Sequence, residues 1–440
     1  MIMSGSSVRR AGVALVAAGA LVALPTLLPP PAGAGAAYAA GRTGGAGPAG
    51  AAQGREQWRG GWAAAPQPAT DVFGKNWSGS GFARQTVRQV VRVSTGGSRA
   101  RITLSNRYGA APLRIAGATV GLTDKGAAVR PGSVRQLTFG HRKSATIPAG
   151  GELSSDGVGL SVRPLAALTV TLYFDGPTGP VTFHGKAMAT SYRAAGDHRA
   201  DVGAAAFAET SSSWYVLSGV EVAGGGPVRR DGIVAFGDSI TDGYGSTVDA
   251  NHRYPDVLAE RLAAAGRPRS VLDEGISGNQ LTHTTPGFGE KALARFPKDA
   301  LNAPNVRTVV LLEGINDIGM SEVSGQPGEP TPEVSARQLI AAQRELIRQA
   351  HRRGIRVIGA TLTPFKGAAY YTERGELKRE VLNGWIRGSG AFDGVVDLDR
   401  VVADPTDRQR IAAGYDSGDH LHPNDAGYRA MAGAIDLDAL

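Results

Sequence analysis

The chain contains no cysteine among its 440 residues. This absence excludes a disulfide framework, a thiolate metal site and a cysteine nucleophile. It does not exclude export from the cell, because a large domain can be stable without disulfides. The chain also lacks dense basic runs interleaved with aromatic residues, although its net charge is +8. Nucleic acid is therefore not an expected partner.

Signatures of metals and nucleotides are missing as well. No P-loop or dinucleotide fingerprint occurs, and six histidines are scattered without the spacing of a metal site. These histidines are His141, His184, His198, His252, His283 and His351. We interpret each of the six as an ordinary surface or core residue, and we expect neither a metal nor a cofactor.

The N-terminus has the pattern of an export signal. Arg9 and Arg10 precede an apolar stretch over residues 11–28, and Ala37-Tyr38-Ala39 fits a signal peptidase site. A membrane anchor is the alternative interpretation, because the apolar stretch approaches the length that spans a bilayer. We predict a cleaved signal peptide over residues 1–39, and hence a secreted, extracellular protein without stable membrane insertion.

Residues 40–56 are rich in Gly and Ala and predict a disordered linker. Short alternating segments then follow over residues 57–224, with turn residues between them, and they predict an all-β sandwich of jelly-roll type. Two of these segments, 87–93 and 101–104, flank Gly96-Gly97-Ser98 and are interpreted as a hairpin.

Strands and helices alternate over residues 231–440. This alternation predicts an α/β fold with a parallel sheet covered on both faces, whose ligands bind outside the carboxyl ends of the strands. The expected strands are 233–236, 270–272, 308–312, 357–360 and 395–398, and the expected helices are 255–265, 333–353 and 425–434.

Four short blocks within this region carry groups suited to chemistry. Gly237-Asp238-Ser239-Ile240 directly follows the first expected strand, and Asp419-His420-Leu421-His422 lies near the C-terminus. Between them come Gly275-Ile276-Ser277-Gly278-Asn279 and Gly314-Ile315-Asn316-Asp317. A serine hydroxyl is a weak nucleophile unless a base lies beside it, and the C-terminal block offers a histidine for that purpose.

In this order the four blocks resemble the SGNH (GDSL-type) hydrolase family of esterases and lipases. The resemblance covers residues 231–440 and implies a three-layer, flavodoxin-like domain that hydrolyses carboxylic esters without a cofactor. It also implies that Ser239 is the nucleophile, His422 the general base and Asp419 the group that orients His422. His420 is out of register with the family motif, and no catalytic role is expected for it.

The resemblance further assigns three oxyanion donors: the backbone N–H groups of Ser239 and Gly278, and the side-chain amide of Asn316. Each residue also has a structural alternative, since serine caps helices, glycine makes turns and asparagine caps turns. Asp238 is expected to hold the turn, and residues 319–332 are expected to form either a loop over the site or an inert connection.

We therefore expect a secreted serine esterase that forms an acyl-enzyme on Ser239. A short-chain or carbohydrate O-acetyl esterase is favoured, because some SGNH carbohydrate esterases also have an N-terminal jelly roll. The substrate would be a small-molecule ester or an acylated polysaccharide. The alternatives are a lipase for longer acyl chains, an acyltransferase and a cell-wall carbohydrate-binding protein. Aromatic residues that could stack on sugars in the last case are Trp58, Trp62, Trp77, Trp214 and Tyr215.

Overall fold

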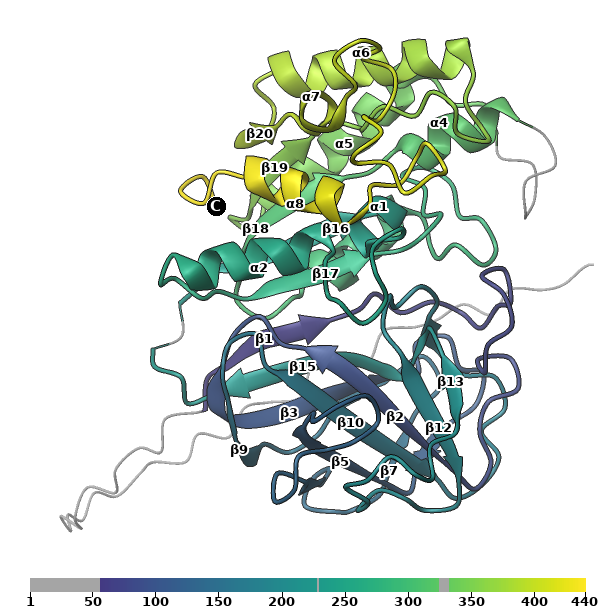
Figure 1. Ribbon diagram of the computed structural model, residues 1–440, viewed down its shortest axis with the longest axis vertical. Helices are drawn as coiled ribbons and strands as arrows, with labels where there is room; N and C mark the ends of the chain where they lie inside the picture. The colour runs from purple at the N-terminus through teal and green to yellow at the C-terminus, as the bar shows by residue number, and fades with distance from the viewer. Residues whose placement is uncertain (1–55, 228, 324–331) are drawn as a thin grey trace, which may run out of the picture. The chain divides into compact units, whose positions relative to one another are not determined.

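The computed structural model describes residues 56–227, 229–323 and 332–440. Its N-terminal part is built from two antiparallel sheets, as expected from the alternating segments (Figure 1). The first sheet contains, in spatial order, β1 (Trp58–Ala63), β15 (Leu217–Ala223), β3 (Gly97–Ser105) and β8 (Glu152–Ser154), with β9 (Val158–Val162) also paired to β3.

The second sheet packs its apolar face on the first. It contains, in spatial order, β13 (Glu209–Ser211), β12 (Ser191–Ala195), β2 (Gln85–Arg92), β10 (Ala167–Phe174), β5 (Gly117–Leu122) and β6 (Arg135–Leu137). Alternate residues of both sheets point into one core: Ile102 and Leu104 on β3, and Val170 and Leu172 on β10, are fully buried. The predicted β-sandwich is therefore confirmed.

The predicted hairpin between the second and third strands is wrong. β2 and β3 lie in different sheets, because the chain crosses the edge of the sandwich between them. At this crossing Val93 N donates to Ala166 O and Ser94 N donates to Gly61 O. A hairpin and such a crossing both consist of two strands of alternating residues joined by a Gly-rich turn. The sequence pattern therefore does not distinguish the two.

Two small antiparallel sheets complete the sandwich: β11 (Phe183–His184) with β14 (Trp214–Tyr215), and β4 (Leu113–Ile115) with β7 (Ala145–Ile147). Four of the five aromatic residues considered for sugar stacking are buried, and Trp58 is partly buried under the guanidinium of Arg101. Trp62 and Trp214, for example, meet edge to face with ring centroids 4.7 Å apart. These aromatic residues are packing residues.

The C-terminal part contains one parallel sheet. Its strands in spatial order are β17 (Val271–Gly275), β16 (Gly232–Gly237), β18 (Val306–Leu312), β19 (Arg356–Ala360) and β20 (Gly394–Val396). Numbered within this part, the order is the 2-1-3-4-5 of flavodoxin-like folds, so the predicted fold class is confirmed. Nearly every residue of β16 and β18 is buried, as expected for strands covered on both faces.

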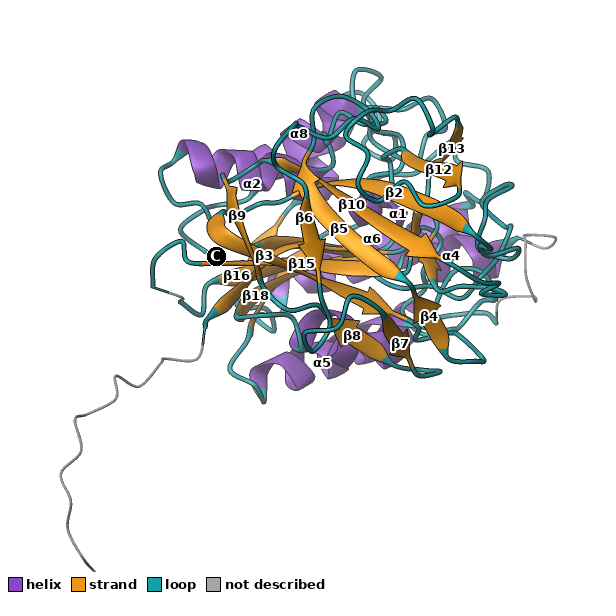
Figure 2. Cartoon of the chain, turned by 90° about the horizontal axis from the view of Figure 1, so that it is seen from below, coloured by secondary structure: helices purple, strands orange, loops and turns teal. Residues whose placement is uncertain are grey.

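Helices cover both faces of this sheet. They are α1 (Ser239–Asp242), α2 (Tyr254–Ala264), α3 (Ala292–Phe296), the π-helix η1 (Pro297–Leu301), α4 (Ile315–Glu322), α5 (Ala336–His351), α6 (Glu373–Gly388), α7 (Leu398–Val402) and α8 (Asp425–Ala434). α2 and α8 lie on one face and α5 on the other (Figure 2). The amphipathic α5 begins at a capping box formed by Ser335 and Gln338, inside the predicted range 333–353.

The sandwich and the α/β part belong to one compact unit, Arg55–Leu440. The edge strand β1 lies beside β17, the edge strand of the parallel sheet (Figure 1). Ser270 Oγ donates to Gly60 O at 2.6 Å, and Val271 N donates to Ser94 Oγ at 2.9 Å. Leu272 packs so closely on Gly60 that a Cβ there would be 2.8 Å from its side chain. Side chains, not a shared ladder of backbone bonds, thus connect the two parts.

Several expectations fall wholly or partly outside the described residues. The predicted signal peptide over residues 1–39 lies outside them, as does the linker over residues 40–56 except for its last residue. The expected loop at 319–332 begins inside α4, which ends at Glu322, and residues 324–331 are not described. In the described part of the chain, no helix has the length and apolar character needed to span a membrane.

Candidate active site

Ser239 lies at the carboxyl end of β16, the strand between β17 and β18. The chain turns there directly into the short helix α1, because the Asp238 carboxylate caps it by accepting from Ile240 N at 3.0 Å. Ser239 is the first residue of this helix and is 4% exposed. Its side chain is therefore held at the sheet rim where ligands bind in open α/β folds.

His422 comes from the loop before α8 and reaches Ser239. Its Nε2 lies 2.8 Å from Ser239 Oγ, and its Nδ1 lies 2.6 Å from Asp419 Oδ2. A carboxylate only accepts hydrogen bonds, so Nδ1 carries the ring proton and Nε2 accepts from the serine hydroxyl. The three residues assigned from the sequence are thus brought together in the order serine, histidine and aspartate.

Asp419 is held by its own turn. Its Oδ1 accepts from His422 N at 2.8 Å, Leu421 N at 3.0 Å and Ser417 Oγ at 3.2 Å. Partial burial alone would raise the pKa of this carboxyl, but the hydrogen bond and charge of His422 and the two backbone N–H groups hold the pKa well below its usual range. Asp419 therefore stays ionised at neutral pH.

Gly278 lies in the turn that follows β17, and two constraints require glycine there. Its φ is +78°, which L side chains rarely adopt, and a Cβ would be only 2.4 Å from the Phe288 ring. Among the described residues, its N–H donates no hydrogen bond, whereas the neighbouring Ser277 N donates to Asp242 Oδ2 at 2.9 Å. The Gly278 N–H remains available to a ligand.

Asn316 is the second residue of α4, which starts just after β18, and it is 2% exposed. Its Nδ2 donates to Asn279 O at 2.9 Å, so the amide lies beside the turn that contains Gly278. Tyr370 OH donates to Asn316 Oδ1 at 3.1 Å. This hydrogen bond holds the oxygen of the Asn316 side chain toward Tyr370 and the nitrogen toward Asn279. One hydrogen of the Asn316 amide is left for a further acceptor.

Sequence reasoning missed Tyr370, which lies between β19 and α6 in a segment without a motif. The only signal for it is structural: Gly319 of α4 leaves room for the tyrosine, since a Cβ there would be 2.3 Å from its ring. Tyr244 was missed as well. Its ring centroid is 4.5 Å from that of His422, and the ammonium of Lys186, a sandwich residue, lies 5.1 Å from the Tyr244 ring.

Other residues of the four blocks serve the local structure. His420 is exposed and donates from Nδ1 to Asp416 Oδ2 at 2.6 Å, away from Ser239. Asp238 is fully buried, and burial together with the negative charges of Asp317 and Asp242 raises its pKa to about 7, against the Ile240 N–H and the charge of Arg295. Asp317 accepts from Leu281 N and from Thr282, which ties the chain after Gly278 to α4.

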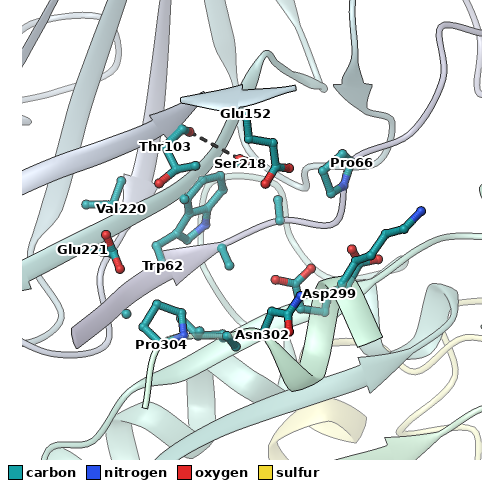
Figure 3. Close-up of a pocket in the computed structure, with 18 of the residues that line it drawn as sticks. Trp62, Pro66, Thr103, Glu152, Ser218, Val220, Glu221, Asp299, Asn302 and Pro304 are labelled. Atoms are coloured by element: carbon teal, nitrogen blue, oxygen red, sulfur yellow. Dashed lines mark hydrogen bonds between the residues drawn. The ribbon is translucent and has the colours of Figure 1, made fainter. Parts of the chain in front are cut away.

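A cavity of about 530 Å³ lies between the first sandwich sheet and η1, lined by Trp62, Glu152 and Asp299 among others (Figure 3). None of the five candidate site residues lines it. Among the residues that the structure describes, no group of three or more His, Cys, Asp or Glu side chains is arranged to hold a metal ion.

Comparisons with known proteins find matches for the C-terminal part of the chain. The model of the GDSL-like lipase/acylhydrolase family matches residues 235–430, a range that contains all five candidate residues. None of the curated proteins matches the chain.

Solved structures similar to this chain include three esterases or lipases, each with a TM-score of 0.35. A GDSL-like lipase from Bacteroides thetaiotaomicron is 21% identical over 48% of this chain and 90% of its own. An acetyl xylan esterase is 21% identical over 46% and 96%, and a lipase/acylhydrolase from Enterococcus faecalis is 18% identical over 47% and 93%.

The family match covers the last three residues of β16 and all of β17, β18, β19 and β20. Residues 235–430 thus match a GDSL-like lipase/acylhydrolase domain, and this C-terminal part of the chain is a carboxylic ester hydrolase domain.

Proposed function

We propose that this protein is a serine esterase in which Ser239 attacks the ester carbonyl. The observation that carries the proposal is the continuous hydrogen-bond chain from Ser239 Oγ through His422 to Asp419. As Oγ bonds to the carbonyl carbon, its proton moves to His422 Nε2. Asp419 accepts from Nδ1, keeps the imidazole in this orientation and stabilises its positive charge.

The negative charge that develops on the carbonyl oxygen requires donors already in place. We assign this role to the N–H groups of Ser239 and Gly278 and to the amide of Asn316. Ser239 and Asn316 lie in the first turns of α1 and α4, and Gly278 lies in the turn after β17, so all three lie at the rim formed by the carboxyl ends of the strands. The first turn of a helix also favours negative charge.

The tetrahedral intermediate then collapses. The carbon–oxygen bond to the alcohol breaks as His422 Nε2–H gives its proton to the leaving oxygen, which leaves an acyl group on Ser239. Water enters next, loses a proton to His422 and attacks the acyl carbon. The carboxylic acid departs and Ser239 regains its proton, with no cofactor at any step.

For the acyl group we propose a short chain such as acetyl. A long acyl chain needs an extended apolar surface beside the nucleophile, and the large apolar side chains that are exposed in the described structure are few and come from separate elements. They are Leu377 and Val381 on α6, Val395 on β20, and Val202 and Val248 in loops. Phe288, the apolar ring closest to Gly278, is 8% exposed and packed against Phe73 of the sandwich.

For the alcohol we propose a carbohydrate. The leaving oxygen must lie near His422 Nε2 to receive its proton, and the partly exposed ring of Tyr244 lies beside that imidazole. An aromatic ring with an apolar face and a polar tip suits a sugar, which also presents apolar and hydroxyl-rich faces. The proposed substrate is thus an O-acetylated polysaccharide or its fragments.

We also propose that the enzyme acts outside the cell. The proposal rests on the sequence of residues 1–39, with its paired arginines, apolar stretch and Ala-x-Ala site. N-terminal sequencing of the protein from the culture medium tests it. A mature terminus close to residue 40 is expected, whereas retention of the intact chain in the membrane fraction would contradict it.

Activity is tested with p-nitrophenyl acetate, butyrate and palmitate, and with acetylated xylan, using wild type and Ser239→Ala. We expect turnover of acetate above palmitate, acetate release from xylan, and loss of both activities in the variant. A preference for palmitate would instead identify a lipase. Equal background rates in both proteins would reject the esterase mechanism.

A further inference from the structure

His184 belongs to the sandwich, in β11, yet its side chain contacts the helix that carries the nucleophile. It is 3% exposed. Its Nδ1 lies 2.9 Å from Ala65 O, and its Nε2 lies 2.9 Å from Oδ1 of Asp242, the last residue of α1. The indole of Trp214 packs against the imidazole with ring centroids 5.5 Å apart. The imidazole is therefore held by the packing of Trp214 and by a hydrogen bond at each of its two nitrogens.

The two partners of His184 determine its protonation. A carbonyl oxygen only accepts, so Nδ1 must donate to Ala65 O. Nε2 faces a carboxylate whose second oxygen already accepts from Ser277, so Nε2 donates as well. Burial alone would lower the pKa of His184, but the charge and hydrogen bond of Asp242, the Ala65 carbonyl and the charge of Asp273 together raise it. His184 is thus an imidazolium paired with the Asp242 carboxylate.

Asp242 carries this contact to the turn that contains Gly278. Its Oδ2 accepts from Ser277 N at 2.9 Å and from Ser277 Oγ at 2.7 Å. Ser277 precedes Gly278, so the orientation of the Gly278 N–H depends on where Asp242 holds the turn. The space is filled: a Cβ on Gly275 would be 2.2 Å from Asp242 N. One carboxylate therefore joins the sandwich to the proposed oxyanion donor.

The charged groups around the pair come from the sandwich and from several segments of the α/β part. Asp273 of β17 adds negative charge beside His184, while Lys186 of the sandwich and Arg253, which precedes α2, each interact with the charge of Asp242. Arg253 is itself paired with Asp256 at 2.6 Å. Asp238, which caps α1, also interacts with the charge of Asp242. Among the described residues, the hydrogen bond of His184 Nε2 goes to Asp242.

A second connection reaches the opposite side of the same turn. Arg107 of the sandwich pairs with Asp299 at 2.5 Å, and Asp299, which also lines the cavity in Figure 3, accepts from Arg295 at 3.4 Å. Arg295 in turn donates to Asn279 Oδ1 at 2.8 Å and to Gly237 O at 2.7 Å. The residues on either side of Gly278 are thus both held by contacts that begin in the sandwich.

We propose that His184 is a positioning residue for ester hydrolysis: through Asp242 it holds the Ser277–Gly278 turn in the place where the Gly278 N–H meets the oxyanion. The sandwich is accordingly a part of the active site and not an appended module. This inference rests on the proposed serine mechanism, since only that mechanism makes the direction of the Gly278 N–H matter for turnover.

The test compares His184→Gln with a matched control, Glu260→Gln, in the full chain. Glu260 of α2 forms a different ion pair with the sandwich, to Arg92 at 2.7 Å, and among the described residues no hydrogen bond joins Glu260 to Asp242 or Ser277. For p-nitrophenyl acetate we expect kcat of His184→Gln to fall about 10- to 100-fold with KM within about twofold. We expect Glu260→Gln to keep the kcat of wild type within about twofold.

A purely structural role would lower the melting temperature of His184→Gln but leave kcat per folded molecule unchanged, and that result would overturn the proposal. Ser239→Ala in the same assay distinguishes failure of the proposed serine mechanism from failure of the proposed positioning role. Wild-type turnover that is lost in Ser239→Ala but retained in His184→Gln would reject only the positioning role. An inactive wild type would reject both.

Should His184→Gln fail to fold, NMR of the ¹⁵N-labelled wild type decides. We expect the His184 ring to show two protonated nitrogens in slow exchange with water at neutral pH, one of them coupled through its hydrogen bond to Asp242. A neutral ring without a proton on Nε2 would overturn the proposal, because Asp242 would then lack the donor that holds it.

Discussion

Two histidine–aspartate pairs lie close to Ser239, and they differ in the third partner of the imidazole. His422 faces a serine hydroxyl, which can donate, so its ring needs only one proton and can accept a second. His184 faces a backbone carbonyl, which cannot donate, so its ring holds both protons. The same two residue types thus form a proton carrier in one place and a fixed cation in the other.

The two pairs also differ in their exposure to solvent. The Asp419 side chain is 41% exposed, whereas those of His184 and Asp242 are 4% and 3% exposed. A proton carrier must be reached by substrate and water, while a positioning pair benefits from a site where its charges are not screened. Removing one partner of the buried pair leaves an uncompensated charge, so the two pairs should respond differently to mutation and to pH.

The largest effect is expected for His422→Ala, which removes the proton carrier. We expect kcat for p-nitrophenyl acetate to fall by at least about 10³-fold, because Ser239 then lacks its base. His420→Asn is the matched control: His420 has φ +63°, which asparagine tolerates, and its ring Nδ1 hydrogen-bonds to Asp416. Turnover in the control should stay within about twofold of wild type. Comparable losses in both variants would contradict the assignment of His422.

Gly278→Ala acts where the two pairs converge. The added Cβ meets Phe288 at 2.4 Å and strains a φ of +78°, so the turn must shift and its N–H must turn away. We expect kcat to fall about 10²- to 10³-fold, the usual cost of an oxyanion donor. Gly384→Ala on α6, where a Cβ meets nothing within 4 Å, should stabilise the fold by about 0.5–1 kcal/mol and leave kcat unchanged. Wild-type kcat in Gly278→Ala would remove the Gly278 N–H from the mechanism.

Tyr370→Phe tests a neutral hydrogen-bond donor, the Asn316 amide, for comparison with the two charged histidine–aspartate pairs. Without the phenol hydroxyl, Asn316 Oδ1 loses its partner and its amide is less well oriented. We expect a fall in kcat of about tenfold with KM unchanged. The neighbouring Tyr371→Phe removes only a bond to Gln409 and should have no effect on kcat. Equal kcat values for the two variants would show that Tyr370 does not orient Asn316.

The smallest effect is a difference in pH dependence. Because folding raises the pKa of His184, its contribution to stability is complete below about pH 6.5 and is lost as the pH rises through the folded-state pKa. Asp419 has the opposite sign: its lowered pKa stabilises the fold above about pH 3.8 and is lost as the pH falls.

Urea unfolding of wild type and His184→Gln between pH 6 and pH 9 measures this contribution. The difference in unfolding free energy should shrink with rising pH, by at most about 1.4 kcal/mol per pH unit. A difference that is constant or grows with pH would show that His184 is neutral in the folded state.

The parts of this protein that could be predicted from sequence are those encoded by short, contiguous patterns. The apolar run before Ser239 and the blocks around Gly278 and Asn316 each end a strand, and parallel strands bring their ends to one rim. α8 begins and ends where its pattern predicts, at Asp425 and Ala434.

The features that could not be predicted from sequence depend on contacts between residues far apart in the chain, which no short sequence pattern reveals. His184 was interpreted as an ordinary residue because its partners, Ala65 and Asp242, lie far from it in the sequence. Tyr370 was missed for the same reason. The helix α6 was not predicted, since its first half is strongly charged and its buried residues Arg379 and Asn383 are polar. In each case the stabilising interactions are tertiary contacts, which the periodicity of apolar residues in the sequence does not reveal.

The position of β1 has a consequence for how the enzyme becomes active. This first strand pairs with β15, near the end of the sandwich sequence, and lies beside β17, which leads into the Ser277–Gly278 turn. Such non-local pairing is slow, because long loops must close before any contact forms. A chain emerging from synthesis therefore holds an incomplete sandwich until β15 arrives. Full catalytic competence should be among the last properties to appear on refolding, after most helical structure has formed.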